Sequence, residues 1–127
     1  MTLPIKHTLV HHVALTVTDM ASSLAFYQQI GFEKFAEFGP KTLTSNGTVM
    51  IGMEASAPAA DRFDEKRVGL DHLSFQVESR EDLETAVTYF DQQSIPHGGI
   101  TDLTDFGIAV LPFYDPDGIA LEFTAAL

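Results

Sequence analysis

Two histidines and one glutamate occupy positions from which they could bind a metal ion. His12 and His72 are 60 residues apart. Each opens a segment with apolar residues one, three and five places on, and with a helix-capping residue at the seventh. Glu122 interrupts an apolar run between Leu121 and Phe123. Imidazole and carboxylate groups are common ligands of divalent first-row metals. The alternatives are hydrogen-bonded structural histidines and an edge-strand acid that faces water.

The repeated segments predict the strands that carry the two histidines. Similarity at a fixed offset of about half the chain indicates a duplicated unit. Apolar and other residues alternate with period two over residues 12–17 and 72–77, which is typical of half-buried strands. In each strand the large apolar side chains should pack under a helix. The histidine should then lie on the opposite face of the sheet.

A helix is expected after each of these strands. Asp19 is a suitable N-cap for the first helix, and Gly31 ends it. Ser79 and the acidic residues after it resemble a capping box for the second helix, which should end before Pro96.

Three short strands are expected after each helix. In the first half they fall near residues 34–38, 41–44 and 48–54, with Asn46-Gly47 as a tight hairpin turn. In the second half they fall near residues 97–101, 108–114 and 119–124, with a type I turn at Asp115-Pro116-Asp117-Gly118. The sequence thus predicts an α+β fold of two βαβββ modules within a single domain of residues 1–127. The modules should span about residues 8–55 and 70–126, joined by a linker at about 56–69.

Four features make the chain resemble the vicinal oxygen chelate superfamily, which contains glyoxalases, bleomycin-resistance proteins and extradiol dioxygenases. They are the opening segment at His12, the start of the second half at Gly69-Leu70-Asp71-His72, the Asp115–Gly118 turn and the closing Ala120-Leu121-Glu122-Phe123. The resemblance covers roughly residues 11–124. It implies the two-module glyoxalase-type fold.

The resemblance also implies a set of metal ligands on the first and last strands of each half. It assigns one divalent ion per site to His12, His72 and Glu122, and these donors suit Fe, Mn, Co, Ni or Zn. A metal and two imidazoles would also compensate for burying a carboxylate in an apolar strand. Two residues are alternatives for the fourth ligand position, which lies on the last strand of the first half. Glu54 would complete a four-ligand set, whereas Gly52 would leave two histidines and one carboxylate. Glu122 and Glu54 are the candidate catalytic residues.

Further residues are candidates for contact with a substrate. Thr16, Ser74 and Gln76 should line the face that carries the histidines, and Tyr114 lies just before the turn. His11 should point away from the site, because neighbours in a strand face opposite ways. His97 is expected to be a solvent-exposed loop residue.

The expected function is that of a metal-dependent, glyoxalase-like enzyme. A bound ion would act as a Lewis acid on two adjacent oxygens of a small substrate, in a lyase, isomerase or dioxygenase type of reaction. The alternative is a non-catalytic protein that binds antibiotics or other small molecules, as bleomycin-resistance proteins do. Thr16 stands where glyoxalase I has a basic side chain, and no Arg precedes Arg62, so a glutathione adduct is not the expected substrate.

Composition excludes several other classes of protein. The chain has no Cys, which excludes disulfides and thiolate chemistry. Its net charge of -11 disfavours nucleic acid as a partner. Fourteen of the 18 acidic residues fall in residues 61–127. No apolar run is long enough to span a membrane. We therefore expect no membrane partner and a cytoplasmic location.

Assembly is expected to complete the site. Four short strands cannot enclose a cavity alone, so two such sheets should face each other. Relatives of this length commonly achieve this between chains. The sequence therefore predicts a homodimer, with each metal site combining His12 of one chain with His72 and Glu122 of its partner. The alternative is a monomer with one self-contained site.

Overall fold

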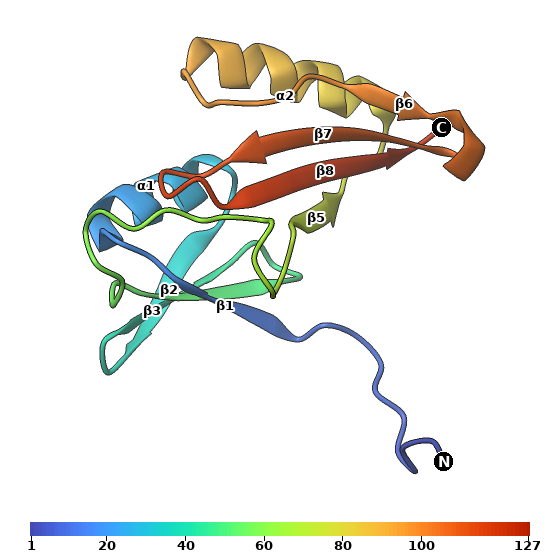
Figure 1. Ribbon diagram of the computed structural model, residues 1–127. Coiled ribbons are helices and arrows are strands. Elements are labelled where there is room, and N and C mark those ends of the chain that lie inside the picture. The colour runs from blue at the N-terminus through green and yellow to red at the C-terminus, as the bar shows by residue number, and fades with distance from the viewer. The chain divides into compact units, whose positions relative to one another are not determined.

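The computed structural model describes residues 1–127 and divides the chain into two compact units, residues 1–60 and 61–127. The predicted linker at about 56–69 spans this division. Each unit contains one helix of two turns or more and one four-stranded sheet (Figure 1). The α+β fold of two βαβββ modules, predicted from the sequence, is confirmed. No helix has the length and apolar character needed to cross a membrane.

The first unit contains one helix and four strands. In chain order they are β1 (His12–Thr16), α1 (Met20–Gln29), β2 (Glu33–Phe38), β3 (Lys41–Ser45) and β4 (Met50–Glu54). The strand order is β1-β4-β3-β2, with β1 parallel to β4 and the other neighbours antiparallel. The first and last strands of the unit are therefore neighbours.

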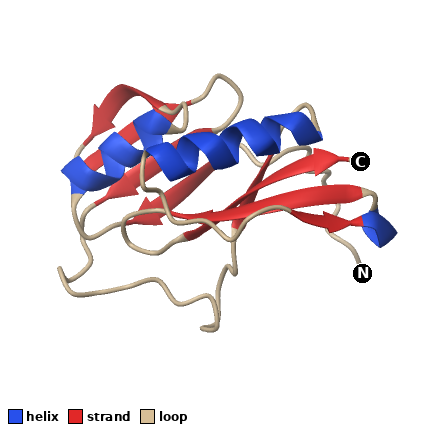
Figure 2. Cartoon of the chain, turned by 90° about the horizontal axis from the view of Figure 1, so that it is seen from above, coloured by secondary structure: helices blue, strands red, loops and turns tan.

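The second unit repeats this arrangement. Its elements are β5 (Leu73–Gln76), α2 (Arg80–Gln92), β6 (Thr101–Leu103), a 3-10 helix (Thr104–Phe106), β7 (Ile108–Tyr114) and β8 (Ala120–Ala126). The strand order is β5-β8-β7-β6, with β5 parallel to β8. The amide of Leu127 donates to the carbonyl of Gly107 over 2.9 Å, which places the C-terminus beside the 3-10 helix (Figure 2).

Local sequence signals explain both helices. The Asp19 carboxylate accepts a hydrogen bond from the amide of Ser22 and so caps α1. Ser79 and Asp82 form a reciprocal capping box at the start of α2. Alternation in β1 and β5 is also as predicted, since Val13, Leu15, Leu73 and Phe75 are half-buried while the residues between them are exposed.

The hairpin between β3 and β4 differs from the prediction. A tight turn at Asn46-Gly47 was expected, with the strand starting near residue 48, but β4 begins at Met50 and the loop has four residues. The Asn46 side-chain oxygen accepts hydrogen bonds from the amides of Thr48 and Val49. These bonds hold Thr48 and Val49 in the loop and so delay the start of the strand.

The strand that follows α2 in the second unit also starts later than predicted. A strand near residues 97–101 was predicted, but β6 starts at Thr101, and His97 makes only an isolated bridge to Phe113. The reason is Pro112 in β7. Proline has no amide hydrogen to donate to the ladder, and its ring leaves no room for a side chain at Gly98. The pairing becomes regular only beyond this point.

Candidate functional site

His72 and Glu122 face each other in the second unit. His72 immediately precedes β5, and Glu122 lies on the neighbouring strand β8. The Nε2 atom of His72 is 3.7 Å from Oε1 of Glu122, and their side chains are 44% and 17% exposed. The separation exceeds hydrogen-bonding distance. The two predicted ligands of this unit therefore meet without bonding directly to each other.

The opposite nitrogen of the His72 ring is held by a carboxylate. Nδ1 lies 2.7 Å from Oδ1 of Asp71. A proton on Nδ1 donated to Asp71 leaves the Nε2 lone pair directed toward Glu122. This hydrogen bond raises the pKa of His72 above its ordinary value. Partial burial lowers that pKa, and the charges of Glu122, Asp71 and Glu65 raise it further.

A short chain of hydroxyl groups orients Glu122. The Thr124 hydroxyl donates to Oε1 of Glu122 over 3.1 Å, and it lies 2.6 Å from the hydroxyl of Ser74. Ser74 pairs with Glu122 in the parallel ladder, so all three side chains lie on one face of the sheet. Ser74, predicted to contact substrate, thus takes part in positioning the carboxylate.

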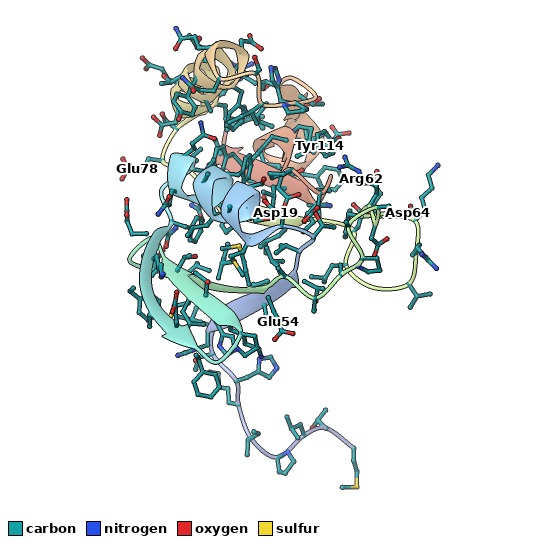
Figure 3. All side chains as sticks on the ribbon, turned by 90° about the vertical axis from the view of Figure 1, so that its left-hand side faces the viewer. Asp19, Glu54, Arg62, Asp64, Glu78 and Tyr114 are labelled. Atoms are coloured by element: carbon teal, nitrogen blue, oxygen red, sulfur yellow. The ribbon has the colours of Figure 1, made fainter.

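Two other predicted residues share this face. Gln76 is exposed and pairs with Thr124, two places beyond Ser74 on β5. Tyr114 ends β7 and pairs with Ala120, which has the same parity as Glu122 on β8. Figure 3 labels Tyr114, which comes from the strand next to the one that bears the carboxylate. His97 lies outside this group. It accepts from the amide of Gly99 and meets the Asp91 carboxylate at 2.7 Å.

In the first unit, His12 lies at the exposed start of β1. Its Nδ1 atom is 2.9 Å from Nδ1 of His11, so one ring donates and the other accepts. Both imidazoles border a pocket of about 270 Å³ on the sheet. The expectation that His11 points away is wrong, because β1 begins at His12 and strand alternation does not extend to the residue before it.

The register of the first sheet separates Glu54 from His12. His12 pairs with Met50, whereas Glu54 pairs with Thr16 at the far end of the same strands, about 13 Å along the sheet. Figure 3 shows the Glu54 side chain extending away from the ribbon. In the second unit the carboxylate lies opposite the residue two places after the histidine. The equivalent position in the first unit is Gly52, opposite Ala14.

Neither unit gathers three or more metal-ligating side chains within itself. The pair that does meet fits a metal ion. Two ligand atoms each about 2.1 Å from a metal ion lie at most about 4.2 Å apart, so the 3.7 Å between Nε2 and Oε1 is compatible with joint coordination. The imidazole oriented by Asp71 adds the outer hydrogen bond that metal-binding histidines usually make.

Two residues of this site were missed from the sequence. Asp71 was noted only as part of the segment before His72, and Thr124 only as the end of a strand. Thr124 could have been found, because it follows Glu122 by two places and so shares its face in a strand. Nothing in the sequence indicates that Asp71 bends back onto its neighbour, since that contact depends on the loop before β5.

Comparisons with known proteins agree with this fold. Residues 9–123 match the sequence profile of the family described as the Glyoxalase/Bleomycin resistance protein/Dioxygenase superfamily. A domain from Frankia sp. EAN1pec, described as a glyoxylase/bleomycin resistance protein/dioxygenase domain, is 28% identical with a TM-score of 0.80; the match covers 96% of this chain and 94% of that one. No match was found among curated proteins.

Two less similar crystal structures share the fold. A lactoylglutathione lyase from Agrobacterium tumefaciens is 20% identical, with a TM-score of 0.75 and 94% of each chain covered. A fosfomycin resistance protein from Listeria monocytogenes is 18% identical, with a TM-score of 0.76, and covers 97% of this chain and 96% of its own.

Proposed function

Because this chain belongs to the glyoxalase/bleomycin resistance protein/dioxygenase superfamily, we propose that it is a divalent-metal-dependent enzyme that acts on a small substrate with two adjacent oxygen atoms. The observation that carries the proposal is the approach of His72 Nε2 to Glu122 Oε1, with Asp71 on the other side of the ring. His12 is the third ligand in this proposal, and the ion is one of Fe, Mn, Co, Ni or Zn.

The residues around the ion would divide the chemistry between them. When bound, a divalent cation supplies Lewis-acid chemistry that stabilises negative charge on a substrate oxygen. Thr124 holds Oε1 of Glu122, so Oε2 is the atom available to take a proton from the substrate. Gln76 and Tyr114, on the same face, would orient the substrate. These roles suit a lyase, an isomerase or a dioxygenase, and both the lactoylglutathione lyase and the fosfomycin resistance protein share the fold.

Metal content is the direct test. Protein purified without a chelator should hold or take up about one equivalent of divalent metal per site, and His72→Ala and Glu122→Ala should each reduce this to below about a tenth. His7→Ala is the matched control, since His7 is an exposed histidine before the first strand, and it should leave the metal content unchanged. Wild-type protein that takes up none of the five metals contradicts the proposal.

The second candidate is a non-catalytic small-molecule binder. The observation in its favour is that neither unit collects a metal-binding cluster by itself, while the first unit has a ready-made pocket. Thermal shift in chelator-treated buffer separates the two candidates. Ligand stabilisation that survives His72→Ala, with no turnover when metal is restored, supports binding alone.

We also propose that the active form is a homodimer. Each site would combine His12 of one chain with His72 and Glu122 of its partner, so that two incomplete ligand sets become complete on assembly.

A further inference from the structure

The pocket of the first unit is built by all four strands of its sheet. It has a volume of about 270 Å³, close to the lower end of the range for small-molecule sites. Its main lining residues are Phe35, Phe38, Lys41, Leu43, Met50 and Gly52. Ala14 and His12 of β1 border it on the side of the proposed metal ligand. The pocket is therefore of a size for one small molecule.

The walls of the pocket are aromatic and unusually exposed. Phe35 and Phe38 are 54% and 72% exposed, although both are large apolar side chains. Strand alternation would place them on opposite faces, but the register of β2 against β3 shifts between Lys34 and Ala36. Such a bulge lets both rings border the same pocket. Two exposed rings that converge on one hollow provide an apolar surface for a ligand to cover.

The floor of the pocket is open because Gly52 has no side chain. A Cβ atom at this position would lie 3.3 Å from Cδ2 of Leu43, which is a tight contact. Any larger residue would therefore fill the pocket or push Leu43 aside. At the position equivalent to Glu122, the first unit thus has open space where the second unit has a carboxylate.

The lining of the pocket differs in charge from the chain as a whole, which has a net charge of -11. Lys41 is the one lysine or arginine in the lining, which contains no acid. Lys34 on the neighbouring strand is already paired with Glu37 at 2.6 Å, whereas Lys41 makes no ion pair. Glu54 is the cross-strand neighbour of Lys41, but it does not border the pocket. The acidic residues that dominate the net charge lie mainly in the second unit, and salt screens charges beyond about 8 Å.

We propose that this pocket binds the apolar body of a small organic anion, such as an aromatic or branched aliphatic carboxylate. The anionic group pairs with Nζ of Lys41, and the rings of Phe35 and Phe38 cover the apolar part. The identification of this ligand as the substrate rests on the proposed function, since His12 borders the same pocket. A cationic ligand, which the net charge alone would favour, has no acidic partner here.

Isothermal titration with 4-phenylbutyrate and 4-phenylbutylamine in chelator-treated buffer tests this proposal. The carboxylate should bind about tenfold more tightly than the amine, because Lys41 attracts the carboxylate and repels the ammonium group. Lys41→Gln should weaken carboxylate binding about threefold to fivefold and remove the preference. Lys34→Gln removes the same charge from the next strand and should leave both affinities unchanged.

A second pair of variants tests the aromatic walls. Phe38→Ala should weaken both probes about tenfold, whereas Phe106→Ala, which removes an equally exposed ring from the 3-10 helix of the second unit, should weaken neither. Equal affinity for the two probes, preference for the amine, or no effect of Lys41→Gln overturns the proposal. If Phe38→Ala instead dissociates an oligomer and spares probe binding, the face is an interface between copies.

These titrations need no metal, so the two proposals fail separately. Carboxylate binding without metal uptake leaves the pocket assignment in place and contradicts the proposed enzyme. Metal uptake without a carboxylate preference supports the metal site and contradicts the substrate class.

Discussion

Asp71 determines which nitrogen of His72 is available to a metal. Its carboxylate engages Nδ1, which leaves Nε2 facing Glu122. The same hydrogen bond raises the pKa of His72, so protons compete with a metal ion for Nε2 to a higher pH than they would for an isolated imidazole. Since the folded-state pKa lies above that of the unfolded chain, His72 contributes stability in acid that is lost as pH rises through the folded-state pKa.

Replacing Asp71 should separate its effect on the pKa of His72 from its effect on the strength with which the imidazole binds metal. In Asp71→Asn the pKa of His72 falls toward its ordinary value, and metal uptake begins at a lower pH. Above both pKa values the variant should bind metal about tenfold more weakly, because the imidazole loses the carboxylate that makes it a better donor. NMR titration of the histidine ring protons and metal titrations across pH measure both. Asp105→Asn, a change of the same kind on the 3-10 helix, should alter neither. An unchanged His72 pKa in Asp71→Asn contradicts this account.

The positions of Glu54 and Gly52 relative to His12 depend on strand register, which the sequence does not reveal. Spacing and alternation placed both residues on the ligand-bearing face of one strand, but they could not say which lies nearer His12. The register aligns Gly52, not Glu54, with the position of Glu122. It therefore favours the alternative with two histidines and one carboxylate.

Removing each carboxylate in turn tests this choice. Glu54→Gln should leave metal affinity within about twofold of wild type, whereas the matched change Glu122→Gln should lower it by about a hundredfold or more, because only Glu122 lies beside a histidine. Calorimetric titration with Mn or Co salts measures both. Comparable losses in the two variants would restore Glu54 to the ligand set.

At the scale of elements, the sequence predicts most of the fold for identifiable reasons. Caps at Asp19 and Ser79 and the alternation in β1 and β5 are local signals, and the structure bears them out. The predicted β7, residues 108–114, coincides with the observed strand. The start of β6 could not be predicted, because it depends on Pro112 in a partner strand. Pairing partners are properties of the folded sheet and not of the local segment.

The aromatic layer beneath the second sheet should control the stability of that unit. Phe113 on β7 is fully buried, and its ring centroid lies 4.7 Å from those of both Phe90 on α2 and Phe123 on β8. Phe113→Ala should lower the free energy of unfolding by about 3 to 5 kcal/mol. Phe106→Ala, on the exposed 3-10 helix, should change it by less than about 0.5 kcal/mol. Urea denaturation followed by circular dichroism measures both; a small loss at Phe113 would show that the layer repacks.

At the scale of the whole molecule, the sequence identifies candidate residues in both halves but cannot say how the halves combine. The His12 and His72 segments are 60 residues apart, and nothing local to either one determines whether they meet within a chain or between chains. This is why the ligand pair within the second unit can be argued from contacts, while the position of His12 relative to it remains part of the proposed dimer.

Complementation tests the shared site. His12→Ala and Glu122→Ala proteins should each fail to bind metal alone. After subunit exchange, half of a statistical mixture is heterodimer, and each heterodimer has one intact site and one doubly damaged site. The mixture should therefore recover about a quarter of wild-type metal binding. Light scattering that shows a stable monomer, or exchanged mixtures that recover none, contradicts the shared site.

The strand order in the two sheets has a consequence for how such a protein can evolve. The histidine-bearing segments lead into or form the edge strands β1 and β5, and Glu122 lies on the adjacent β8, whereas the aromatic walls of the pocket belong to β2 at the opposite edge of its sheet. Mutations in β2 can therefore change which small molecule the pocket prefers, because two strands separate β2 from His12, the nearest proposed metal ligand. Descendants of one ancestor can diverge in the molecules they accept and retain the same coordinating residues.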